Sequence, residues 1–250
     1  MSKPLVSIIT PCYNSEKYIA ETIQSVLNQT YPYWEMLITD DGSTDHSIEI
    51  IQEFVLRDSR IKLFQKNKQG AAKTRNNSIS EAKGSYMAFL DSDDLWFPVF
   101  LETSIKFCKE SQGFVCASYE MKDDDQNQVH LPLIVPQKVN KHQVLKTNTI
   151  GCLTAFIDVE KLGKELMPEV AYRQDMGLWI KYLDKIEYCY GIQQVLACYR
   201  VRKTSLSANK FNLLRPQWNF YRKVARKNFG MSLYYMLIWT YYGLKKYRKV

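Results

Sequence analysis

The first hundred residues alternate four times between a short apolar run and a stretch with the apolar spacing of a helix. Each apolar run has the length and the β-branched content of a buried strand. Strands that alternate with helices predict a parallel sheet with helices on both faces, joined by right-handed crossovers. The sequence therefore predicts an α/β fold, with strands at Leu5–Ile9, Trp34–Thr39, Ile61–Phe64 and Met87–Leu90.

Three helices are expected between these strands. Ser15 is the expected N-cap of the first, in which Ile19, Ile23, Val26 and Leu27 share one face. The second starts near Thr44, and the third covers residues 70–79. Gly84 follows the third helix, where a residue with left-handed backbone conformation often ends a helix.

Acidic residues follow two of the expected strands directly. The strand ending at Leu90 leads into Asp91, Asp93 and Asp94, and the one ending at Thr39 leads into Asp40 and Asp41. Carboxyl ends of parallel strands share one edge of a sheet, where open α/β sheets bind their ligands. Carboxylates there are suitable ligands for a hard cation. The alternative is a solvated acidic turn that caps the helix beginning near Pro98.

The alternation stops after Pro98. We expect a helix over residues 99–109, then strands at 114–119, 129–135, 153–157, 186–190 and 193–199. Asp123–Asp125 is expected to be a solvated hairpin tip. Asp175 precedes a helix over residues 176–183, where it either serves in a site or stabilises the helix dipole. The basic loop at residues 200–207 either holds a phosphate or is soluble surface.

Charge divides the chain into an acidic body and a basic tail. Residues 188–250 contain 13 Lys and Arg and no Asp or Glu, which leaves 21 basic against 26 acidic residues in the first 187. Within the tail, residues 228–244 are uncharged, but 17 residues including four Tyr are too few for a predicted membrane span. The tail is expected either to lie at a lipid headgroup interface or to form helices that dock on the body.

The six cysteines are scattered, without a CxxC pair or zinc-finger spacing. They are expected to be buried thiols in a reducing compartment. The N-terminus has no secretory signal pattern. We therefore expect a cytoplasmic protein, peripheral on the cytoplasmic face of the plasma membrane through its tail.

Five segments occur in order along the chain: residues 6–14 (VSIITPCYN), 39–45 (TDDGSTD), 70–76 (GAAKTRN), 86–94 (YMAFLDSDD) and 173–175 (RQD). Together, over residues 5–207, they resemble the family 2 glycosyltransferases, which have a GT-A fold. This resemblance implies a catalytic domain over residues 1–207, with a nucleotide-binding half at 1–97 and an acceptor half at 98–207. Residues 208–250 are expected to form a basic and aromatic helical tail.

The resemblance also implies roles for individual residues. Asp41 would bind the uracil ring of a UDP-sugar, and Asp93, helped by Asp91, would hold Mn²⁺ or Mg²⁺ on the donor diphosphate. Asp94 is adjacent and stays open as a further ligand. Asp175 would be the general base that deprotonates the acceptor hydroxyl. The remaining nucleotide-binding residues would be Thr10, Pro11, Tyr13, Lys73, Arg75 and Ser92.

These residues predict an inverting, metal-dependent hexosyl- or N-acetylhexosaminyltransferase. A cation neutralises the charge that develops on the leaving diphosphate, and a carboxylate activates the incoming hydroxyl. A Gln-x-x-Arg-Trp motif and long membrane spans, typical of processive members, are lacking, so we expect transfer of a single sugar to a glycan or lipid-linked acceptor. Cell-surface polysaccharide or lipopolysaccharide synthesis is the expected setting. The alternatives are a nucleotidyltransferase, a catalytically idle nucleotide-sugar-binding protein and a nucleic-acid binder, although no nucleic-acid motif is recognisable.

Overall fold

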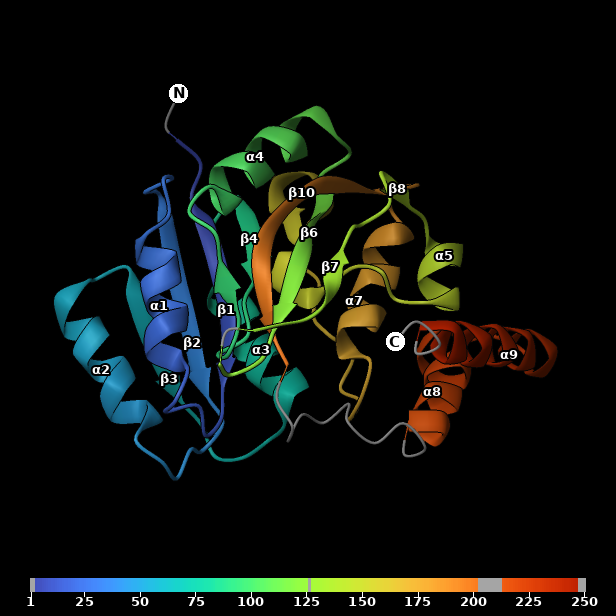
Figure 1. Ribbon diagram of the computed structural model, residues 1–250, viewed down its shortest axis with the longest axis horizontal. Helices are drawn as coiled ribbons and strands as arrows, with labels where there is room; N and C mark the ends of the chain where they lie inside the picture. The colour runs from blue at the N-terminus through green and yellow to red at the C-terminus, as the bar shows by residue number, and fades with distance from the viewer. Residues whose placement is uncertain (1–2, 126, 202–212, 247–250) are drawn as a thin grey trace.

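A mixed β-sheet organises the molecule, seen in a computed structural model that describes residues 3–125, 127–201 and 213–246 (Figure 1). Within these residues the sheet has ten strands, eight of them in the order β3-β2-β1-β4-β9-β6-β10-β5, with β7 paired to β6 and β8 to β10. The strands are β1 (Val6–Cys12), β2 (Trp34–Asp40), β3 (Ile61–Gln65), β4 (Tyr86–Phe89), β5 (Leu95–Trp96), β6 (Phe114–Lys122), β7 (Gln128–Leu133), β8 (Lys138–Val139), β9 (Phe156–Asp158) and β10 (Cys189–Arg200).

Helices cover both faces of this sheet. Those of the body are α1 (Ile19–Leu27), α2 (Ser47–Arg57), α3 (Ala71–Glu81), α4 (Phe100–Glu110), α5 (Lys141–Lys146), the 3₁₀ turn η1 (Cys152–Thr154), α6 (Val159–Leu162) and α7 (Gln174–Leu183). Those of the tail are α8 (Leu214–Asn219), the π-helical turn η3 (Phe220–Val224) and α9 (Phe229–Lys246).

Strands β1 to β4 form the parallel part of the sheet, as predicted. β1 pairs in parallel with both β2 and β4, and β2 pairs in parallel with β3. The second half is mixed, because β9 runs antiparallel to both β4 and β6. The carboxyl ends of β1, β2 and β4 therefore lie at one edge, and the acidic turns follow two of these strands.

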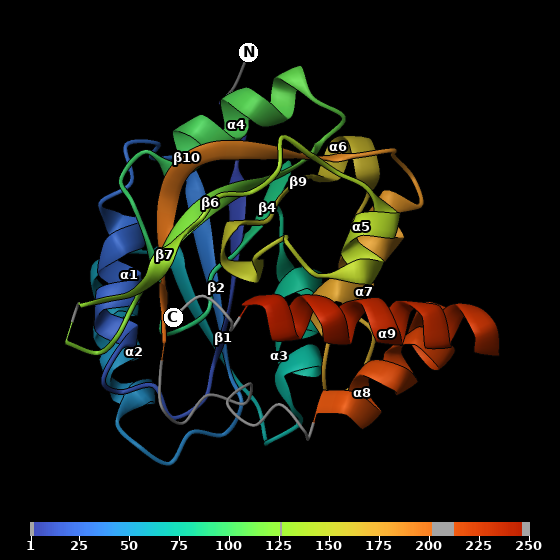
Figure 2. The same ribbon diagram turned by 45° about the vertical axis from the view of Figure 1, so that its right-hand side comes forward.

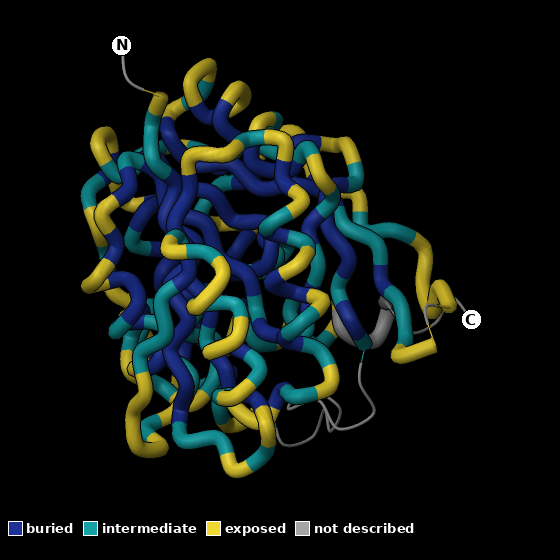
Figure 3. Tube along the Cα trace, turned by 90° about the vertical axis from the view of Figure 1, so that its left-hand side faces the viewer, coloured by how far each residue is buried: buried dark blue, intermediate teal, exposed yellow. Residues whose placement is uncertain are grey.

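Successive residues of the central strands supply two separate hydrophobic cores. On β1, Ile8 packs with residues of α1, α2 and α4, while Ile9 packs with residues of α3, α5 and α7. This alternation follows from the two-residue period of a strand. Because both faces of the strand are buried, its sequence is continuously apolar. In Figure 3 the buried segments run through the middle of the molecule, with exposed positions around them.

The sequence prediction for Ser15 was wrong. Helix α1 begins at Ile19, and its N-cap position is occupied by Tyr18 without a side-chain cap. Ser15 is instead buried, and its hydroxyl pairs with the Ser92 hydroxyl at 2.7 Å. A long-range contact, which sequence spacing does not reveal, thus replaces the local cap.

The role predicted for Gly84 was also wrong. Helix α3 ends at Glu81 with extended backbone at Ala82, and Gly84 does not have a positive φ. A Cβ atom on Gly84 would lie 2.7 Å from backbone atoms of Leu5, Ser7 and Tyr86. Gly84 is therefore required by close packing of backbone where β4 enters the sheet.

The later strands differ from the prediction in their bounds. Residues 153–157 divide into the turn η1 and the short strand β9, and one long strand, β10, replaces the two expected at 186–190 and 193–199. Register shifts between Ile192 and Ala197 mark bulges in β10, so its hydrophobic pattern is interrupted. The hairpin between β6 and β7 is confirmed, and its tip is held by Asp123, which accepts the backbone N–H of Asp125 and of Asn127.

The tail docks on the body, which is one of the two arrangements predicted from the sequence. Tyr221 is fully buried and donates a hydrogen bond to the Leu145 carbonyl at 2.8 Å, and the Tyr235 hydroxyl pairs with His142 Nδ1 at 2.7 Å. Figures 1 and 2 show α8 and α9 beside α5 and α7, at the end of the molecule away from β3. None of the helices in the described ranges is long and apolar enough to cross a membrane. The expected domain boundary at residue 207 and most of the basic loop at 200–207 lie outside the described residues.

Candidate active site

The end of β1 supplies the first part of the site. Thr10 is fully buried, and its hydroxyl has no hydrogen-bond partner within the described residues. Beyond Pro11, Tyr13 is 41% exposed, and Lys68 lies over its ring at 4.2 Å while donating to its hydroxyl at 2.9 Å. A buried hydroxyl without a partner and an exposed ring at a strand end offer a hydrogen bond and a stacking surface to a ligand.

The turn after β2 fixes two carboxylates. Asp40 is fully buried and accepts the backbone N–H groups of Gly42 and Ser43, so it shapes the turn. Asp41 accepts the N–H of Gln69 at 2.8 Å and of Gly70 at 3.0 Å, one on each oxygen. These bonds hold the start of α3 against the end of β2 and leave each Asp41 oxygen with a further lone pair. Base recognition by Asp41 stays a prediction.

The turn after β4 separates its carboxylates into different roles. Asp91 pairs with Arg75 at 2.5 Å, and Ser92 bonds to Ser15 as described above. Asp94 is 1% exposed and accepts the backbone N–H of Arg200 at 3.0 Å, so it ties the turn to the end of β10. Asp93 lies between them and is half-buried. Asp91 and Asp93 therefore remain the accessible pair, whereas Asp94 is used inside the fold.

Arg75 connects this turn to the second half of the molecule. Its side chain is 12% exposed, and its Nε has no hydrogen-bond partner within the described residues. Burial lowers the pKa of the guanidinium, but the charges of Asp91 and Asp175, together with Cys152, outweigh burial and raise it overall. Arg75 is thus a permanent positive charge in the field of both carboxylates.

Asp175 lies in the first turn of α7 and is half-buried. Its Oδ2 accepts a hydrogen bond from Asn148 Nδ2 at 2.9 Å. Burial is the main cause that raises the pKa of the Cys152 thiol, and the charges of both Asp91 and Asp175 add to it. Tyr119 likewise has a raised pKa, caused first by burial and in part by Asp94 and Asp175. Asp91, one of the predicted metal ligands, and Asp175, the predicted base, therefore both act on the buried Cys152.

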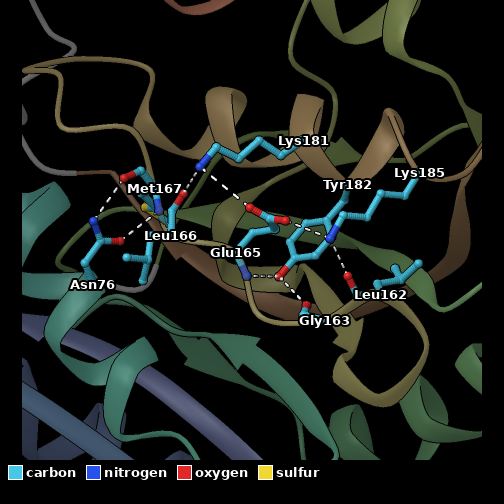
Figure 4. Close-up of polar contacts among 9 residues, drawn as sticks. All are labelled: Asn76, Leu162, Gly163, Glu165, Leu166, Met167, Lys181, Tyr182 and Lys185. Carbon is cyan, nitrogen blue, oxygen red and sulfur yellow. Dashed lines mark hydrogen bonds and ion pairs between the residues drawn. The ribbon is translucent and has the colours of Figure 1, made fainter.

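The loop before α7 is anchored on both sides (Figure 4). Asn76 on α3 exchanges two hydrogen bonds with the backbone of Met167, at 2.8 and 2.9 Å. Tyr182 of α7 accepts the Glu165 N–H, and Lys185, just after α7, forms an ion pair with Glu165 at 2.7 Å. Because Asn76 is next to Arg75, these contacts fix the segment leading to Asp175 relative to the helix that carries Arg75.

Arg173, two residues before Asp175, has a left-handed backbone conformation with φ of 65°. Such a conformation is uncommon for a residue other than glycine and requires support from its surroundings. The side chain supplies it: Nε donates to Gln217 Oε1 of α8 at 2.8 Å, and the guanidinium lies 5.6 Å from the Trp239 ring of α9. The tail helices therefore help to set the entry into α7.

The oxygen donors fit a divalent cation that shares its coordination with a substrate. Within the described residues no group of three or more His, Cys, Asp or Glu side chains forms a complete metal centre. Mg²⁺ is commonly held by one or two carboxylates together with substrate phosphates. Asp91 and Asp93 match that donor set, and a cation there would need the phosphates of a bound nucleotide.

Several residues of the site lie where sequence did not place them. Lys73 was expected near the nucleotide, but it is exposed and pairs with Glu169 at 3.6 Å, and its nucleotide contact stays a prediction. Asn148, Tyr119 and Arg173 were not identified as site residues at all. Asn148 and Tyr119 come from segments without a distinctive motif, so only the fold brings them to Asp175. Arg173 could have been identified from the sequence, because it lies two residues before Asp175.

A parallel α/β half with acidic turns at its carboxyl edge, continued by a mixed half that carries another acid, is the architecture of a GT-A glycosyltransferase. The chain belongs to this class and, within it, to glycosyl transferase family 2, whose model matches residues 7–160.

Relatives match along the whole chain. A putative teichuronic acid biosynthesis glycosyltransferase of Bacillus subtilis (strain 168), TuaG, is 38% identical over 98% of each chain. A UDP-Glc:alpha-D-GlcNAc-diphosphoundecaprenol beta-1,3-glucosyltransferase of Escherichia coli, WfgD, is 36% identical, covering 99% of this chain and 96% of its own. Among solved structures, TarS 1–349 of S. aureus in complex with UDP-GlcNAc has a TM-score of 0.70 at 21% identity, over 94% of this chain and 71% of its own. These matches confirm the predicted family and fold.

Proposed function

We propose that this protein transfers a single sugar from a UDP-sugar, with inversion, to a hydroxyl group of a lipid-linked glycan in cell-surface polysaccharide or lipopolysaccharide synthesis. The names of the relatives support the donor and the acceptor, since WfgD is named for UDP-glucose and for a diphosphoundecaprenol acceptor. The GT-A neighbour TarS binds UDP-GlcNAc. The sugar is a hexose or an N-acetylhexosamine.

The single observation that carries the proposal is the position of Arg75. It forms an ion pair with Asp91 and lies in the field of Asp175, so residues far apart in the sequence converge on one charged centre. A transferase needs such convergence, because the leaving diphosphate and the attacking hydroxyl act on the same sugar carbon. An exposed acidic turn that only caps a helix would not require residues from distant segments to converge on it.

Each residue has a task that its surroundings suit. Thr10, Tyr13 and Asp41 bind the nucleoside, and the Asp91–Asp93 turn faces the diphosphate, with Ser92 held by Ser15. A divalent cation, Mn²⁺ or Mg²⁺, held by Asp91 and Asp93 would neutralise charge on the leaving diphosphate. Arg75 adds a fixed positive charge beside this position.

Asp175 accepts the proton of the acceptor hydroxyl as that oxygen attacks the anomeric carbon. Asn148 orients the carboxylate by donating to one oxygen, which leaves the other oxygen for the hydroxyl. Attack from the face opposite the leaving diphosphate inverts the anomeric centre.

The tail gives the protein a surface suited to a membrane. Along α9 the side chains of Phe229, Leu233, Leu237 and Tyr241, spaced four residues apart, are all exposed, while Tyr235 faces the body. Exposed basic residues come before this stripe in the chain. They are Arg222 and Lys223 in η3, and Arg226 between η3 and α9. An apolar aromatic stripe next to cations suits the anionic headgroup region of a membrane. We propose that the protein lies peripherally on the cytoplasmic membrane face, where lipid-linked acceptors are found.

The test is transfer from radiolabelled UDP-sugars to lipid extracts by wild type and Asp175→Asn. The variant keeps the shape of the side chain and an acceptor oxygen for Asn148, so we expect turnover to fall about 10²- to 10⁴-fold with unchanged affinity for UDP. Asp184→Asn, at an exposed ion pair with Lys141 at the other end of α7, is the control and should keep full activity. Equal turnover of Asp175→Asn and wild type would exclude Asp175 as the base. Absence of transfer and of UDP binding in wild type would exclude the function.

A further inference from the structure

A groove next to the candidate base has no role in the chemistry described so far. It lies between the loop at residues 170–172 and the helices α8 and η3, with a cavity volume of about 280 Å³. Tyr172, one of its lining residues, is three residues before Asp175. A ligand in this groove would therefore be next to the segment that carries the base.

The lining combines apolar walls with two cations. Val170, Tyr172, Pro216 and Phe220 supply apolar surface, and Arg215 and Lys223 are both exposed. Neither cation forms an ion pair with a carboxylate in the described part of the chain. Among the described residues that line the groove, none is Asp or Glu. Cations without counter-charge beside an apolar wall suit a ligand that is anionic at one end and apolar at the other.

We infer that this groove binds the prenyl diphosphate carrier of the acceptor. The inference rests on the proposed function and specifies how the acceptor is held. Arg215 and Lys223 would hold the diphosphate, since a guanidinium matches phosphate oxygens with paired hydrogen bonds. The apolar walls would cover the first part of the prenyl chain, and the volume suffices for only that part.

The position of the groove supports this occupant. Lys223 belongs to η3, and both η3 and α8 contact α9, so the groove is formed by the helices on which the exposed apolar stripe rests. Figure 2 shows α8 and α9 lying next to each other, near α7. A prenyl chain leaving the groove would thus run toward the proposed membrane surface, while its sugar points toward Asp175.

The direct test is the binding of farnesyl diphosphate, a short and soluble prenyl diphosphate, measured by titration calorimetry. The double variant Arg215→Ala/Lys223→Ala should weaken binding roughly tenfold or more, because two charge-assisted contacts are lost. Lys106→Ala/Lys109→Ala is the matched control: it removes the same charge from exposed positions on α4, and it should bind like wild type.

Three further titrations make the result specific. Farnesol and inorganic pyrophosphate should each bind much more weakly than farnesyl diphosphate, because each has only half of the recognised chemistry. Saturating UDP should not displace farnesyl diphosphate. Displacement by UDP, equal binding of pyrophosphate, or equal binding by both double variants would overturn the inference.

The two proposals can fail separately. A protein that transfers sugar to soluble acceptors but binds farnesyl diphosphate no better in wild type than in Arg215→Ala/Lys223→Ala keeps the proposed function and loses the groove. A protein that binds farnesyl diphosphate in the groove, but neither binds UDP nor transfers sugar, keeps the groove as a prenyl diphosphate site and loses the transferase.

Discussion

The Arg173 guanidinium donates to Gln217 Oε1 at 2.8 Å and thereby joins the segment before the candidate base to the first helix of the tail. Gln217 is fully buried, so the contact is shielded from water. The tail is thus anchored to the segment that carries the candidate base.

Replacing Arg173 tests this connection. Arg173→Ala keeps a Cβ atom at the left-handed position and removes the hydrogen bond and the contact with Trp239, so Asp175 should lose its orientation. We expect kcat to fall about tenfold, since small displacements of a catalytic group reduce the rate strongly. The KM for the donor should stay the same, because the nucleotide residues are on other elements. Arg173→Lys, which can still donate to Gln217, should recover part of kcat. A change confined to the donor KM would contradict a positioning role.

The ion pair of Arg75 with Asp91 predicts a stability effect. Asp91→Asn leaves a guanidinium that is 12% exposed with less compensating charge, so the free energy of unfolding should fall by about 2 kcal/mol, below the 3–5 kcal/mol typical of fully buried pairs. Denaturant titration measures this loss. The double variant Arg75→Met/Asp91→Asn should be more stable than the sum of the two single changes implies. Additive losses would show that the two side chains are not coupled.

Sequence predicted the parallel half of the fold well, because its strands are continuous apolar runs and acids directly follow two of them. The pattern at Trp34–Asp40 and Tyr86–Phe89 depends only on local alternation and burial, and the structure follows it. Prediction failed where the deciding contact is distant in sequence. Ser15 pairs with Ser92 and Gly84 packs against Leu5, and neither contact leaves a trace in residue spacing.

The candidate site shows the same division. The acidic residues could be recognised in the sequence, because a charge at the end of a buried strand costs free energy unless it binds a partner or a ligand. The surroundings of Asp175 were not, since Asn148 lies 27 residues away in a segment without a motif. Arg173 lies beside Asp175 in the sequence, but its left-handed backbone and its contact with α8 arise only in the folded chain.

Glu35 predicts how stability depends on pH. Its carboxylate is buried and accepts hydrogen bonds from Ser7, from the Lys83 backbone and from Lys62. Burial raises the pKa of Glu35, but these donors outweigh it and lower the pKa below the ordinary value of 4.5. A lowered pKa means that Glu35 stabilises the fold at pH above 4.5, and that this contribution disappears as pH falls through the folded-state value.

Glu35→Gln should therefore reduce the free energy of unfolding at neutral pH by about 1–3 kcal/mol, because one oxygen that accepts is replaced by an NH₂ group facing Lys62. The difference from wild type should shrink in urea titrations as the pH is lowered below 4.5. Glu53→Gln, at an exposed pair with Arg57, should change stability little at any pH. A difference for Glu35→Gln that stays constant down to low pH would rule out the ionised carboxylate as its source.

The exposed stripe on α9 predicts binding to anionic membranes. Phe229 and Leu237 are 65% and 64% exposed, so replacing both with Asp removes apolar surface and adds negative charge without disturbing the buried face at Tyr235. Wild type should sediment with vesicles that contain phosphatidylglycerol and much less with vesicles of pure phosphatidylcholine, and high salt should weaken the binding. Phe229→Asp/Leu237→Asp should stay in the supernatant. Leu56→Asp, at a position 88% exposed on α2, should sediment like wild type because α2 is not part of the tail. If Leu56→Asp released the protein and the α9 variant did not, the membrane surface would have to lie on another face.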